Sequence, residues 1–82
     1  MEQNSKITIS IPSNHRWVVE NLIERFEKAY QIKIFIEDEE DRDGVNFFIV
    51  SSDQFTHDLI FEIGYYYSGY IRQLRDIGEI DE

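Results

Sequence analysis

Apolar and polar residues alternate near the start of the chain. From Lys6 to Ile11 isoleucine occupies every second position, with polar residues between. A period of two is typical of a strand with one buried face. Pro12 ends this strand, and Ser13 or Asn14 is expected to cap the helix that follows.

Residues 14–30 carry a helical period instead. Projected at about 100° per residue, the apolar residues that share one face are Val18, Val19, Leu22, Ile23, Phe26, Ala29 and Tyr30. That face is predicted to be buried. Trp17 projects from the opposite side, where tryptophan is a candidate contact for a partner. Since it lies in the first turn, it can also fold back over the end of the strand.

Two further strands are expected at Ile32–Glu37 and Val45–Ser51. The second is rich in β-branched and aromatic residues. Its residues predicted to face inward are Val45, Phe47 and Ile49. The segment between the strands is acidic and ends in Asp43-Gly44, a turn dipeptide. The two strands are therefore predicted to form a hairpin joined by an acidic loop.

A second helix is predicted to begin at Ser52 or Asp53. Its apolar side consists of Thr56, Leu59, Ile60, Ile63, Tyr66, Tyr67, Tyr70, Ile71, Leu74 and Ile77. Gly64 and Gly69 each cost about 1 kcal/mol inside a helix. An alternative is therefore that the helix ends at Gly64 and that Tyr65–Ile71 forms a fourth strand. The continuous helix is favoured because the apolar spacing runs through both glycines.

The order β-α-β-β-α predicts one α+β domain over residues 1–82. Its architecture is a two-layer sandwich, with a three-stranded sheet and two helices on one face. This pattern resembles a ferredoxin-like fold that lacks its last strand. The resemblance concerns the order of elements, and no family is assigned from it.

Several large apolar residues have no predicted place in the core. The sheet face away from the helices would display Phe35, Phe48 and Val50. The second helix, about 37 Å long, would extend past strands of about 23 Å and leave its last turns without cover. Exposed apolar surface of this kind indicates an interface, here a homodimer. The predicted interface residues are Phe35, Phe48, Phe61, Tyr65, Tyr70, Leu74 and Trp17.

The chain carries 17 acidic and 8 basic residues, a formal charge of −9. Such a charge repels nucleic acid and anionic lipid, so neither is expected as a partner. The acidic patch consists of Glu37, Asp38, Glu39, Glu40, Asp41 and Asp43, and a second acidic group closes the chain at residues 79–82. Acidity can serve solubility alone. It also allows an alternative function, a nucleic-acid-mimicking inhibitor of a DNA- or RNA-handling protein, of the phage-type, anti-CRISPR-like kind.

No catalytic, cofactor or metal site is predicted. The chain has no cysteine, which excludes disulfides, thiolate metal sites and a cysteine nucleophile. Ser51, Ser52, His57 and Asp58 supply the residue types of a catalytic triad, but they lie too close in sequence for its geometry. No signal peptide or membrane span is visible. The prediction is a soluble, cytoplasmic, non-enzymatic module that binds protein and associates with itself.

Overall fold

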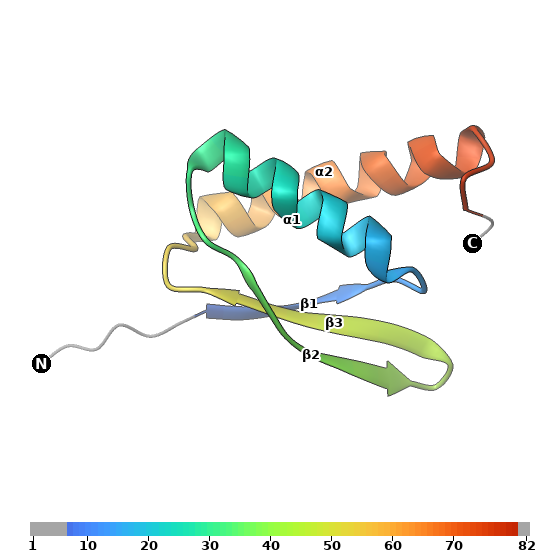
Figure 1. Ribbon diagram of the computed structural model, residues 1–82, viewed down its shortest axis with the longest axis horizontal. Helices are drawn as coiled ribbons and strands as arrows, with labels where there is room; N and C mark the ends of the chain where they lie inside the picture. The colour runs from blue at the N-terminus through green and yellow to red at the C-terminus, as the bar shows by residue number, and fades with distance from the viewer. Residues whose placement is uncertain (1–6, 81–82) are drawn as a thin grey trace, which may run out of the picture.

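The computed structural model describes residues 7–80 (Figure 1). The elements in chain order are β1 (Ile7–Pro12), α1 (Arg16–Tyr30), β2 (Phe35–Arg42), β3 (Val45–Ser52) and α2 (His57–Asp76). The predicted α+β class is confirmed. Lys6, expected in the first strand, and Asp81 and Glu82 of the acidic terminus lie outside the described residues.

The three strands form one sheet in the order β1-β3-β2, and both pairings are antiparallel. Both helices lie on the same side of this sheet in Figure 1. The main core is enclosed between the two layers, with Val19 and Leu22 of α1 against Phe48 and Val50 of β3. No helix within residues 7–80 covers the second sheet face.

The hairpin turns at Asp43 and Gly44, whose φ angles of 55° and 86° are both positive. Positive φ at both central residues defines a two-residue type I′ turn, which matches the twist of the flanking strands. The turn places Arg42 opposite Val45. The acidic run was expected to form a loop, and this is wrong for all of it except Asp43 in the turn. The rest lies in β2, which pairs with β3 except at a bulge between Ile36 and Asp38.

The predicted inward face of β3 is also wrong. Phe48 and Val50 are each 1% exposed, whereas Val45 is 41% exposed. Val50 pairs with Ile9 on one side and with Ile36 on the other, so the isoleucines of both edge strands share its face. A shift of one residue exchanges the two faces of a strand. Phe48 therefore belongs to the core and cannot form the predicted interface.

Helix α1 begins two residues later than predicted. Its N-cap is His15, and no side chain caps that end. Ser13, a predicted cap, is buried in the loop, where its hydroxyl accepts from the N–H of His15 over 3.0 Å. The predicted core face is confirmed from Val18 to Phe26, but Ala29 and Tyr30 at the end of the helix are exposed.

Helix α2 runs without a break through both glycines, so Tyr65–Ile71 is helical and not a fourth strand. Its N-cap is Thr56, whose hydroxyl accepts from the N–H of Leu59 over 3.1 Å. The predicted caps Ser52 and Asp53 lie before the helix: Ser52 belongs to β3. The expected start is therefore wrong by about one turn.

The C-terminal end of α2 folds back on itself. Gly78 has a φ of 82°, and the N–H of Glu79 donates to the carbonyl of Leu74 over 2.9 Å. This pattern is a Schellman motif, which reverses the chain direction. Ile80 is thereby buried against Val18, Tyr70 and Leu74. The expectation that Tyr70 and Leu74 extend without cover is wrong, since the chain covers them itself.

Candidate functional site

Two aromatic side chains stand exposed on the solvent side of α2. Phe61 is 74% and Tyr65 78% exposed, and they lie four residues apart, so they project side by side. Their predicted exposure is confirmed. Apolar side chains this open on a regular helix are candidates for contact with another molecule.

Tyr30 at the end of α1 borders these residues. Its hydroxyl donates to Glu62 Oε1 over 2.8 Å, and its ring stacks on Phe26 at a centroid distance of 5.6 Å. The hydrogen bond to the Glu62 carboxylate, together with desolvation, raises the pKa of Tyr30 above its usual value. Arg25 Nη1 donates to the hydroxyl of Tyr66 over 2.7 Å. These contacts fix α1 against α2 and hold the borders of the site in place.

Two shallow hollows flank Tyr65. One, of about 310 Å³, lies between the helices and is lined by Phe26, Ala29, Tyr30 and Tyr66 among others. The other, of about 360 Å³, lies over Gly69. We call Tyr30, Phe61 and Tyr65 the aromatic surface. On two surfaces of this kind, the projecting rings of one can pack into the open hollows of the other.

The remaining predicted interface residues are not part of this surface. Phe35 is exposed on the sheet face away from the helices, opposite Ser51. Trp17 is exposed in the first turn of α1, with its ring 6.3 Å from that of His15. Together with the burial of Phe48, Tyr70 and Leu74, this leaves only Phe61 and Tyr65 adjacent among the predicted residues.

All six residues of the acidic patch are exposed, but most of their carboxylates have a partner. Five of them form hydrogen bonds or ion pairs: Glu37 with Ser51, Asp38 with a neighbouring N–H, Glu39 with Arg16, Glu40 with Arg42 and Asp41 with the N–H of Gly44. The ion pair of Glu40 and Arg42 is 2.7 Å long. The negative potential of the patch is therefore partly neutralised within the hairpin.

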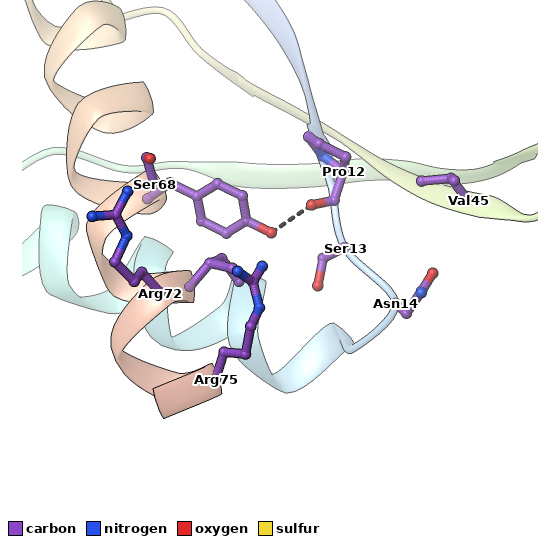
Figure 2. Close-up of a pocket in the computed structure, with 9 residues that line it drawn as sticks. Pro12, Ser13, Asn14, Val45, Ser68, Arg72 and Arg75 are labelled. Atoms are coloured by element: carbon purple, nitrogen blue, oxygen red, sulfur yellow. Dashed lines mark hydrogen bonds between the residues drawn. The ribbon is translucent and has the colours of Figure 1, made fainter. Parts of the chain in front are cut away.

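A groove of the opposite charge lies between α2 and the end of β1 (Figure 2). It has a volume of about 340 Å³, and its lining includes Arg72, Arg75, Ser68 and Asn14 but no acidic residue. Guanidinium groups in such a groove can bind a carboxylate or a phosphate. Sequence reasoning missed this site, because arginines in the last turns of a helix are equally explained by the helix dipole.

The residue types of the rejected catalytic triad do not meet. Ser51 and Ser52 are buried, and the hydroxyl of Ser51 donates to Glu37 Oε2 over 2.5 Å. His57 is exposed in the first turn of α2. Between residues 7 and 80, acidic and histidine side chains nowhere gather in threes as metal ligands. Over the same range, neither helix has the length and apolarity required to cross a membrane.

No protein-family model, curated protein or solved structure matches this chain. Its function is therefore inferred from its own residues.

Proposed function

We propose that the protein is a non-enzymatic protein-binding module that associates with itself through the aromatic surface. The observation that carries this proposal is the exposure of Phe61 and Tyr65 on adjacent turns of α2. Exposure of the apolar surface of two such rings to water is unfavourable in free energy, and contact with a second surface would remove this surface from water. A twofold dimer brings identical patches together, so the projecting rings of each copy meet the hollows of the other.

The charge of the chain supports a protein partner over nucleic acid or a membrane. At −9 it repels phosphate-bearing surfaces. Copies of the same chain also repel one another, but the acidic patch lies on β2, whereas the aromatic surface lies on the helices. The absence of cysteine supports a reducing compartment, and we propose the cytoplasm.

The test is the oligomeric state of two matched variants in sedimentation equilibrium. Phe61→Ser/Tyr65→Ser removes both projecting rings, and Phe35→Ser removes an exposed aromatic ring from the sheet. Aromatic side chains at the centre of an interface contribute about 2 kcal/mol each, so the double variant is expected to weaken the dimer at least about 100-fold. Phe35→Ser is expected to leave it unchanged. A wild-type chain that remains monomeric at about 1 mM would refute self-association.

A second candidate function is the nucleic-acid-mimicking inhibitor, favoured by the exposed acidic patch. Its internal hydrogen bonds and ion pairs reduce the charge available to a basic channel, so it ranks second. The test is capture of nucleic-acid-binding proteins by the immobilised chain, with release by duplex DNA. Charge reversal in Asp38→Lys/Glu40→Lys/Asp41→Lys should abolish capture, and wild-type capture should fall steeply with salt. Unchanged capture by the charge-reversed variant would reject mimicry.

We further propose that the architecture is a ferredoxin-like fold without its last strand. The support is the topology: β1 and β2 flank β3 and are both antiparallel to it, so β1 and β2 run parallel with α1 as their connection. An experimental structure with a different strand order would overturn this assignment.

A further inference from the structure

The two edge strands of the sheet, β1 and β2, differ in how readily they can pair with a further strand. Six of the eight residues of β2 are charged, and its register shifts at a bulge. β1 has no charged residue in Ile7–Pro12, and it pairs with β3 in a regular register. Charges and bulges discourage further pairing at an edge. β1 is therefore the edge that can accept another strand.

The pairing of β1 with β3 determines which backbone groups point outward. The N–H of Ser13 donates to the carbonyl of Asn46 over 2.9 Å, in the register of the two strands. Because hydrogen-bonded pairs alternate along antiparallel strands, the isoleucines of β1 direct their backbone groups toward β3. Thr8, Ser10 and Pro12 direct theirs toward the edge. Pro12 has no N–H, so Thr8 and Ser10 supply the available N–H and C=O groups.

One flank of α2 lies above this edge. The flank that faces α1 carries Glu62 and Tyr66, which hydrogen-bond to residues of α1. The opposite flank consists of Ile60, Gly64, Tyr67 and Ile71. Its three side chains are only half-buried, and beyond the helix itself nothing lies within 4 Å of a Cβ added at Gly64. The Tyr67 hydroxyl donates to the carbonyl of Pro12, which places this flank over the end of β1 (Figure 2).

The groove that contains Arg72 and Arg75 lies at the Pro12 end of the same edge (Figure 2). The ion pairs within residues 7–80 are formed by other cations, on α1 and β2. Both guanidinium groups are thus available to a ligand. In a chain of net charge −9, they make this end of the edge the place where a carboxylate is attracted.

We propose that the β1 edge binds an extended segment of a partner protein, which adds as a fourth strand beneath α2 and places a carboxylate against Arg72 and Arg75. The segment has about six residues, the length of β1. Its alternate side chains are apolar, because the half-buried Ile7 and Ile9 and the flank of α2 cover only one of its faces. Main-chain pairing supplies affinity in such complexes, and pockets supply specificity.

A second copy of the whole sheet does not fit this edge. Pairing of β1 with the β1 strand of another copy would set the two strands about 4.8 Å apart. Each strand would bring its own α2, and packed helix axes require about 8–10 Å. A single strand avoids this clash. The strand site lies along β1, whereas Phe61 and Tyr65 are exposed on the solvent side of α2. The two sites share one residue, Arg72, which also lines the hollow over Gly69. The strand pairing itself does not depend on self-association.

The test uses labelled peptides of alternating valine and threonine with an aspartate at the first or the last position. In NMR titrations, the amides of Thr8 and Ser10 are expected to shift and to become protected from hydrogen exchange. Arg72→Gln/Arg75→Gln is expected to weaken binding about tenfold or more, as loss of charge-assisted hydrogen bonds implies. The matched control Lys28→Gln/Lys33→Gln changes net charge equally elsewhere and is expected to change affinity less than about twofold.

Further controls separate strand addition from other binding. A peptide methylated on the amide nitrogens that would face β1 cannot pair and is expected to lose binding, whereas Phe61→Ser/Tyr65→Ser is expected to retain it. Equal binding of the methylated peptide, equal losses in both charge variants, or no shifts at about 1 mM peptide would overturn the proposal. Shifts at Thr8 and Ser10 that grow with protein concentration alone would also overturn it, since a second copy would then occupy the edge.

Discussion

Replacing Ile80 by alanine tests whether the C-terminal turn holds the end of α2 in place. Ile80 is 5% exposed and packs on Val18, Tyr70 and Leu74, whereas Ile77, three residues earlier, is 63% exposed. Ile77→Ala is therefore a matched control, with the same change of side chain in the same segment of chain.

The expected magnitude follows from the burial. The substitution removes three carbon atoms, and each buried methylene contributes about 0.8 kcal/mol, which gives a transfer cost of about 2.4 kcal/mol. A residue near the chain end can relax into part of the space, so we expect Ile80→Ala to lower the free energy of unfolding by about 2 kcal/mol. Ile77→Ala should change it by less than about 0.5 kcal/mol.

Urea denaturation followed by circular dichroism measures both variants. With a slope of about 1 kcal/mol/M, the midpoint for Ile80→Ala should fall by about 2 M. The total stability of a chain this size is roughly 4–12 kcal/mol, so the variant remains folded in buffer. Equal midpoints for the two variants would refute the reasoning, because burial of Ile80 would then contribute nothing to stability.

The other predictions concern the turn, the cap and a tyrosine. Gly44→Ala should lower the melting temperature, because a φ of +86° costs a residue with a Cβ about 1–2 kcal/mol. Gly64→Ala should raise the melting temperature, because it should increase the free energy of unfolding by about 0.5–1 kcal/mol. Shifts of the same sign would contradict one of the two predictions. Thr56→Ala should destabilise the protein by about 1 kcal/mol in the same assay through loss of the N-cap. Glu62→Gln should lower the pKa of Tyr30 toward 10.0, seen as earlier phenolate absorbance near 295 nm. Because the pKa of Tyr30 is raised in the folded state, its contribution to stability is present below pH 10.0 and is lost as the pH rises through the raised pKa.

The helices could be predicted from the sequence because their apolar spacing is unambiguous. The buried residues of α1 follow the predicted face, and α2 continues through Gly64 and Gly69 because its packing outweighs their propensity cost. The exposure of Phe61 and Tyr65 follows from the same periodicity, since both fall opposite the core stripe of α2. The third residue of the aromatic surface, Tyr30, was instead predicted on the core face of α1. Such local patterns do not depend on distant parts of the chain.

The strands were harder because their burial depends on pairing. Both faces of β3 are apolar, with Phe47 and Ile49 on one and Phe48 and Val50 on the other, so only the register with β1 decides which is buried. The acidic β2 has weak strand propensity and forms a strand because β3 pairs with it. The burial of Ile80 depends on a chain reversal at Gly78 whose three-dimensional direction no periodicity encodes.

The apolar interior is divided into two clusters, and this division sets how the molecule opens. The smaller cluster, built on Val18, Tyr70, Leu74 and Ile80, is joined to the larger one through Tyr66 and Tyr67, which pack against both. A unit closed by so few side chains can detach without loss of the sheet. Amide hydrogens in the last two turns of α2 should therefore exchange through a local opening of low free energy. Those of β3 should exchange only when the whole chain unfolds.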